Sequence, residues 1–212
     1  MTIPTPPLLL ITDRRQAGGN IIGIAEAAFS AGCRWLSLRE KDLPPTEQIA
    51  LLRELLSCAG KYRAKVTLHG EAKLAREAGA SGVHLPAGCD AAEARRLLGN
   101  DALIGLSIHH AEEAHAVDGK LADYVIAGPV FETESKPRYG PALGPEGLAL
   151  IAEASPVPVV AIGGIKPGTV SDCLLAGAAG IAVMGGVMRA KDPAELVAQL
   201  VGALGFNLQS GA

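Results

Sequence analysis

The segment of this chain best suited to chemistry follows a short apolar run at residues 124–127. After the Gly-Pro step that ends the run come Thr133, Ser135 and Lys136. Two hydroxyl groups and an ammonium group at the end of a strand suit the capture of an anion. We therefore expect these three side chains to bind substrate.

Two glycine pairs further along the chain also end apolar runs. They are Gly163 with Gly164 and Gly185 with Gly186. Glycine lets bare backbone N–H groups approach an anion closely. A simple turn would explain each pair alone, but together with the hydroxyl-rich segment they predict a phosphate site at neighbouring strand ends.

A second cationic group lies near the N-terminus, where Arg39 and Lys41 follow the apolar run 35–38. Residues two apart in an extended segment share a face, and arginine can hold an oxyanion with two parallel hydrogen bonds. The pair is expected to bind a second anion or a carboxylate. The alternative is a surface pair that solvates the strand end, together with Glu40.

Histidines follow the middle strands. Ser107 and His109 share a face by the same period of two, and histidine is the side chain best suited to reversible proton transfer near neutral pH. His109 is the candidate catalytic acid and base, although a capping or core histidine is the alternative. His69 ends the third run and is expected to contact substrate, while His84 is equally suited to packing or to ligand contact.

The acidic residues near the strand ends, Asp13, Glu40 and Asp90, form no converging set of oxygen ligands for a hard divalent ion. The sequence therefore predicts no metal site and no cofactor. It also contains no Ser-His-Asp order, and its cysteines adjoin no evident base, so covalent catalysis has little support.

The elements that must position these residues alternate regularly. Eight short apolar runs occur at residues 8–11, 35–38, 65–68, 82–85, 103–107, 124–127, 159–162 and 181–184. Eight stretches of helical periodicity separate or follow them, at residues 21–31, 46–59, 71–78, 91–98, 111–117, 146–154, 169–176 and 194–204.

This alternation predicts an α/β fold, a single (β/α)8 TIM barrel formed by one domain of residues 1–212. A doubly wound open sheet is the alternative, but no Gly-x-Gly-x-x-Gly follows the first run. In a barrel the chemistry gathers at the carboxyl ends of the strands, where the candidate residues lie.

The amino-acid composition limits the classes of molecule that the protein could bind. The formal net charge is −3, with 19 Lys and Arg against 22 Asp and Glu, so no global basic field would attract a nucleic acid. The four cysteines are scattered and suit a reducing cytoplasm. The first apolar run is too short to cross a membrane, so we expect a cytoplasmic protein with no membrane partner.

The motifs, taken together, resemble the thiamine phosphate synthase/TenI superfamily. The segments that carry the resemblance are Leu10–Asp13, Leu38–Lys41, Gly82–Leu85, Ile104–His109, Ala122–Tyr124, Gly128–Thr133 with Ser135–Lys136, and Ala161–Ile165. The resemblance implies a barrel enzyme of thiamine biosynthesis. It also implies one of two activities.

The first activity joins a pyrimidine diphosphate to a thiazole phosphate and uses Mg²⁺ to hold the departing pyrophosphate. This chain departs from that pattern. The usual glutamine is Ser37, the Asn-Asp pair after the third strand is His69-Gly70, and the second metal-binding acid is displaced to Asp90. Without those carboxylates the leaving group lacks most of its charge neutralisation.

The second activity, of the TenI branch, is a metal-independent thiazole tautomerase that aromatises a thiazole carboxylate phosphate. The resemblance implies that Thr133, Ser135, Gly164, Gly185 and Gly186 hold the substrate phosphate. Arg39 and Lys136 would then bind the carboxylate, and His109 would move the proton.

Two alternatives remain. One is a Mg²⁺-dependent thiamine phosphate synthase in which Asp90 or Glu40 replaces the missing ligands, and the retention of Arg39, Lys41 and Lys136 favours it. The other is a non-catalytic binder of thiamine phosphate or its thiazole precursor. Barrels with apolar outer helices often form homodimers, and the sequence leaves the oligomeric state open.

Overall fold

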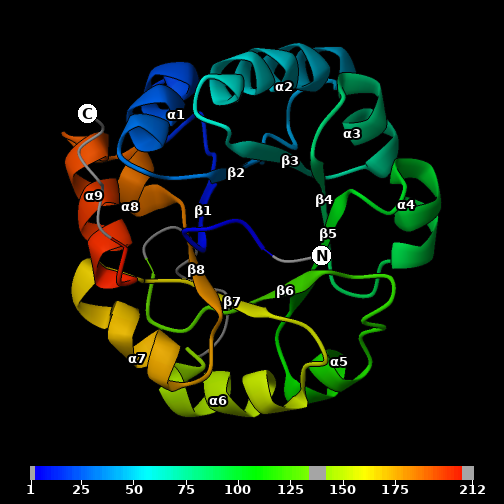
Figure 1. Ribbon diagram of the computed structural model, residues 1–212, viewed down its shortest axis with the longest axis vertical. Helices are drawn as coiled ribbons and strands as arrows, with labels where there is room; N and C mark the ends of the chain where they lie inside the picture. Colours follow the sequence, from blue (N-terminus) through cyan, green and yellow to red (C-terminus); the bar gives the residue numbers. More distant parts are fainter. Residues whose placement is uncertain (1–2, 134–141, 207–212) are drawn as a thin grey trace.

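The chain forms a closed barrel of eight parallel strands. The computed structural model describes residues 3–133 and 142–206, and within them each strand pairs with the next while β8 pairs with β1 (Figure 1). The strands are β1 Leu8–Ile11, β2 Trp35–Leu38, β3 Lys65–His69, β4 Gly82–Leu85, β5 Leu103–Ile108, β6 Tyr124–Ala127, β7 Val159–Ile162 and β8 Gly180–Val183. The predicted (β/α)8 TIM barrel is confirmed.

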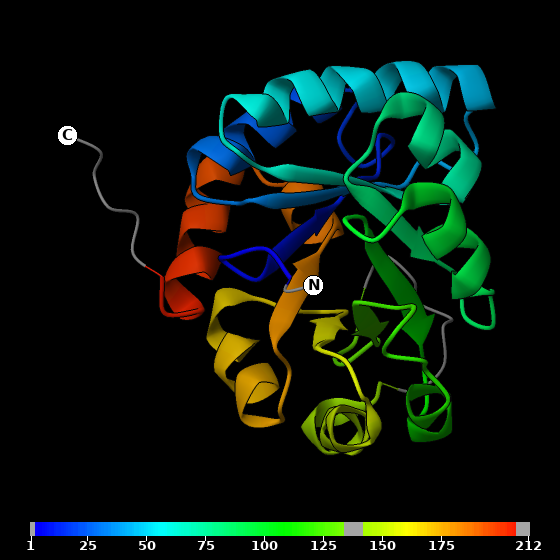
Figure 2. The ribbon, with the colours of Figure 1, turned by 45° about the vertical axis from the view of Figure 1, so that its right-hand side comes forward.

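Helices surround the barrel on its outside, as Figures 1 and 2 show. They are α1 Ile21–Ser30, α2 Pro45–Gly60, α3 Ala72–Ala78, α4 Ala91–Leu98, α5 Ala111–His115, α6 Gly144–Ala154, α7 Val170–Leu175, α8 Gly185–Met188 and α9 Pro193–Ala203, with a 3-10 turn η1 at Pro167–Thr169. The four-residue helix α8 was not predicted. It comes directly after β8, so it lies at the end of the barrel where the strands point.

Capping side chains fix where several helices begin. Asn20, Asp90 and Asp192 each accept a hydrogen bond from a backbone N–H in the first turn of the helix that follows. These bonds satisfy donors that have no partner within a helix. Gly79 ends α3 with a φ of 77°, in the left-handed region that glycine adopts at least cost.

Large side chains fill the interior of the barrel below the strand ends. The rings of Trp35 and Tyr124 meet edge to face with centroids 4.7 Å apart, and both are fully buried. Gly105 makes room for them, because a Cβ atom there would overlap the ring of Tyr124. The interior is therefore closed by packing at this level, and the open space lies above it.

In the two described stretches of chain, no helix combines the length and apolar character that a membrane crossing requires.

Candidate functional site

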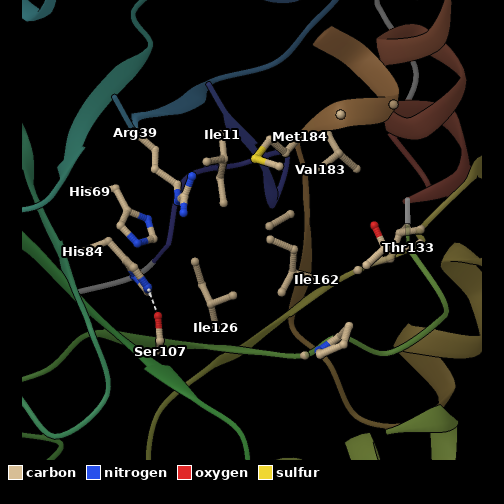
Figure 3. A pocket seen from close by; sticks show the side chains of 18 of the residues that line it. Ile11, Arg39, His69, His84, Ser107, Ile126, Thr133, Ile162, Val183 and Met184 are labelled. Carbon is tan, nitrogen blue, oxygen red and sulfur yellow. Dashed lines mark hydrogen bonds between the residues drawn. The ribbon is translucent and has the colours of Figure 1, made fainter. Parts of the chain in front are cut away.

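A cavity of about 680 Å³ opens at the carboxyl ends of the strands. Its lining includes one or more residues from the end of every strand, among them Ile11, Arg39, His69, His84, Ser107, Ile126, Ile162 and Met184. Figure 3 shows Arg39, His69 and His84 on one side and Thr133 on the opposite side, with Ile126 and Ile162 between them. A cavity of this size, with an apolar middle and polar groups at two ends, fits a small ligand that carries two polar groups.

Most of the predicted site residues meet in this cavity. Its lining contains Arg39, Lys41, His69, Ser107, His109, Thr133, Gly163, Gly164, Gly185 and Gly186. Ser135 and Lys136 lie outside the described residues. Sequence reasoning missed Glu132, Lys166 and Arg189, which also line the cavity.

The cationic side is held in place by the loop after β1. The backbone N–H of Arg39 donates to Thr12 Oγ1 over 2.9 Å, and that hydroxyl donates to Glu40 Oε1 over 2.8 Å. Glu40 is buried, and it also accepts a hydrogen bond from the backbone N–H of Arg14. Its carboxylate is therefore engaged with the β1 loop, and it is absent from the cavity lining that Arg39 and Lys41 share.

Burial and the neighbouring Arg39 guanidinium both lower the pKa of Lys41 below its ordinary value. Partial desolvation and a like charge are the expected results of bringing two cations to one cavity wall. An anion placed between them would relieve this repulsion. The arrangement thus favours a negatively charged group of a ligand at this end.

His84 and Ser107 form a hydrogen-bonded pair in the cavity wall, with His84 Nε2 2.9 Å from Ser107 Oγ (Figure 3). His84 has no exposed surface. Burial, with a smaller contribution from the charge of Lys41, lowers the pKa of His84 to about 3. The imidazole is therefore neutral at physiological pH.

Hydrogen bonds position both the ring and the backbone of His109. Its Nδ1 lies 3.1 Å from the carbonyl oxygen of Gly128, and its backbone N–H donates to Glu113 Oε2 over 2.5 Å. A carbonyl oxygen only accepts, so Nδ1 must carry the proton. In the neutral ring Nε2 then carries the lone pair, and that nitrogen is suited to accept a proton from a substrate.

The glycines that line the cavity differ in whether the backbone requires glycine at their positions. Gly163 and Gly164 have φ angles of 102° and 65°, and a Cβ at Gly163 would lie 2.6 Å from the Cα of Pro129. These two glycines are required by the close approach of the loop after β6. Gly186 has no such need, because an added Cβ there would meet no atom within 4 Å.

The missed cation Arg189 follows α8 and is linked to the β1 loop. Its guanidinium donates to the side-chain oxygen of Gln16, whose amide donates to Asp13 Oδ2 over 2.6 Å. Asp13 thus holds the loop after β1 in place. With Lys166, Arg189 adds positive charge to the glycine-rich side of the cavity.

Asp90 and Glu40, the two acids that the sequence offered as replacement metal ligands, are engaged in other contacts. Asp90 caps α4 by accepting from Ala92 N over 2.7 Å, and Glu40 is buried against Thr12. Within residues 3–133 and 142–206 no three His, Cys, Asp or Glu side chains gather in a way that could hold a metal ion. Asp90 and Glu40 are therefore not placed to supply the one or two carboxylates through which proteins usually hold Mg²⁺ beside substrate phosphates.

A family model described as "Thiamine monophosphate synthase" (TMP-TENI) matches residues 8–187. The chain belongs to the thiamine monophosphate synthase family. The resemblance inferred from the motifs is thereby confirmed, and with it the assignment to a family of enzymes.

Several relatives carry the synthase name. A putative thiamine-phosphate synthase of Geobacter sulfurreducens is 40% identical, over 93% of each chain. A thiamine-phosphate synthase of Chlorobium limicola is 35% identical, over 98% of each. The solved thiamine phosphate pyrophosphorylase of Pyrococcus furiosus superposes with a TM-score of 0.82 at 31% identity, covering 93% of this chain and 95% of that one. These names support the synthase alternative better than the tautomerase, which stays a prediction.

Proposed function

We propose that this member of the family acts on a phosphorylated thiazole and catalyses its tautomerisation by proton transfer through His109. The observation that carries the proposal is the composition of the cavity. It presents an oriented histidine together with several cations, while Asp90 and Glu40, the acids that the sequence offered as metal ligands, are engaged elsewhere.

The substrate, a thiazole carboxylate phosphate, would place its phosphate at the glycine-rich side. Thr133, Gly186 and the cations Lys166 and Arg189 supply a hydroxyl, open space and positive charge there. The carboxylate would lie at the opposite side, against Arg39 and Lys41. The apolar residues between the two ends would contact the ring.

In this arrangement the base is Nε2 of His109, because Nδ1 donates to the carbonyl of Gly128. The imidazole takes a proton from the ring carbon and becomes an imidazolium. It then returns a proton to the exocyclic carbon, or the two steps occur in the reverse order. In either order the ring is aromatised, the histidine ends in the protonation state in which it began, and no other reactant is consumed.

The second candidate is the synthase reaction, which the names of the relatives favour. Its structural support is the number of cations in the lining, Arg39, Lys41, Lys166 and Arg189, against the single carboxylate of Glu132 among the described lining residues. A diphosphate and a monophosphate together would match this charge. Since Asp90 and Glu40 are engaged elsewhere, the side-chain cations would carry most of the neutralisation of the pyrophosphate.

The test compares His109→Asn with the parent protein on both reactions. For the tautomerase we expect turnover to fall by about 10²–10⁴-fold while substrate affinity is retained. His115→Asn is the matched control, because His115 is exposed at the end of α5. Pyrophosphate release from the two thiamine precursors, measured with and without Mg²⁺, tests the synthase.

Each outcome decides between the candidates. Turnover of the thiazole carboxylate phosphate that His109→Asn leaves unchanged would refute the proposed role of His109. Pyrophosphate release without any tautomerisation would establish the synthase instead. Tight binding of thiamine phosphate or its thiazole precursor with neither reaction would identify a non-catalytic binder.

A further inference from the structure

The pair formed by His84 and Ser107 has a polar atom that the site described above does not explain. His84 Nε2 lies 2.9 Å from Ser107 Oγ, whereas Nδ1 is buried and has no hydrogen-bond partner in the described part of the chain. His84 has no exposed surface, while Ser107 is half-buried and lines the cavity. Both residues line the cavity, but only Ser107 has exposed surface there, so the contact of His84 with a ligand is expected to pass through Ser107.

Two arrangements of the proton satisfy the bond between the two side chains. If Nδ1 carries the ring proton, Ser107 donates to Nε2 and offers only lone pairs to the cavity. If Nε2 carries it, the ring donates to Ser107 Oγ and the hydroxyl proton turns toward the cavity. The doubly protonated ring is not a third choice, because burial and the charge of Lys41 keep the imidazole neutral.

The unpartnered Nδ1 of His84 favours one of these two proton arrangements. A buried N–H without an acceptor is rarer in proteins than an acceptor that lacks a donor, which reflects its greater cost. Placing the proton on Nε2 leaves only a lone pair on the unpartnered Nδ1. The ring contacts around His84, with His69 at 4.6 Å and Tyr124 at 5.6 Å between centroids, hold the ring in this orientation.

We infer that His84 is a positioning residue, which donates from Nε2 to Ser107 and thereby makes Ser107 a hydrogen-bond donor to an acceptor atom of the ligand. This inference rests on the proposed function for the identity of the ligand. The ligand atom that accepts this hydrogen bond is an oxyanion oxygen or an unprotonated ring nitrogen, because each has a lone pair for the hydroxyl proton. Ser107 lies near His84 and His69 in the wall opposite Thr133 (Figure 3), so the selected atom belongs to the end of the ligand away from its phosphate.

The tautomer is measurable without any ligand. In protein labelled with ¹⁵N at histidine, the His84 signals, assigned by their loss in His84→Gln, should show Nε2 protonated and Nδ1 unprotonated at neutral pH. The pattern should persist to about pH 5, because a ring with a pKa near 3 stays neutral there. A proton on Nδ1, or a ring that becomes charged near pH 6, would overturn the inference.

Binding of thiazole carboxylate phosphate tests the consequence. Ser107→Ala and His84→Phe should each weaken binding by about 10- to 100-fold, as expected for loss of one hydrogen bond to a charged acceptor. The double variant should lose no more than either single variant, because both remove the same donor. His84→Gln, which keeps an N–H near the position of Nε2, should restore part of the affinity that His84→Phe loses.

Inorganic phosphate provides the control, since it would bind at the glycine-rich side and its affinity should be the same in all these variants. Additive losses in the double variant, or full affinity in His84→Phe, would contradict the positioning role. Failure of the parent protein to bind thiazole carboxylate phosphate would count against the proposed function. The ¹⁵N result would still decide the hydrogen-bond arrangement.

Discussion

Acidification should destabilise the fold through His84, because this imidazole binds a proton in the unfolded chain and stays unprotonated in the folded chain. The pKa of His84 is about 3 in the fold, owing first to burial and then to Lys41, whereas an unperturbed histidine has a pKa of about 6.5. Between these values the unfolded state holds more protons, so stability is present above pH 6.5 and is lost as the pH falls toward 3. At about pH 5 this single group should cost about 2 kcal/mol relative to about pH 7.5.

Urea unfolding of the parent protein and of His84→Gln, at about pH 7.5 and about pH 5, isolates this contribution. Other titrating groups are common to both proteins, so the difference between their pH dependences reports His84. His115→Gln, which alters an exposed histidine, is the matched control substitution. Equal pH dependence in the parent and in His84→Gln would refute the argument that burial keeps the ring neutral.

Three further substitutions test the site and its framework. Gly186→Ala should raise the Kd for inorganic phosphate by about tenfold or more through loss of one backbone contact. The melting temperature should not change, because the added Cβ meets no protein atom within 4 Å. A normal phosphate affinity would place the anion elsewhere. Gly105→Ala should destabilise the fold by roughly 1–3 kcal/mol or more by forcing the ring of Tyr124 aside, and urea unfolding would measure it. Asp123→Ala should cost about 3–5 kcal/mol, because it leaves the partly buried Arg95 guanidinium, now 2.7 Å from Asp123 Oδ2, without its countercharge. An unchanged unfolding midpoint would show that this pair contributes nothing.

The barrel was predictable because each strand is a short buried apolar run and each long helix has apolar residues at helical spacing. Helix α8 was not, since its four residues are about one turn and begin with two glycines. Arg189 was missed for the same reason, because its place at the cavity depends on that helix. Lys166 was missed because it follows the glycine pair after β7, where the sequence shows neither strand nor helix periodicity that would indicate which residues face the cavity.

Within the site, period-two spacing correctly grouped Ser107 with His109 and Arg39 with Lys41 on the cavity wall. Contacts between separate strands could not be read from spacing. The bond from Thr12 to Glu40 joins residues 28 apart, and the bond from His84 to Ser107 joins residues 23 apart. Both depend on the register of the closed barrel, which places Glu40 against the loop after β1 and His84 beside Ser107.

The most direct test of the proposed chemistry is deuterium incorporation into thiazole carboxylate phosphate, followed by mass spectrometry in heavy water with a chelator present. Proton transfer by His109 predicts that the parent protein incorporates deuterium at the exocyclic carbon in the absence of free divalent metal and that His109→Asn does so at least about 100-fold more slowly. No incorporation by the parent protein, together with Mg²⁺-dependent release of pyrophosphate from the two thiamine precursors, would contradict it.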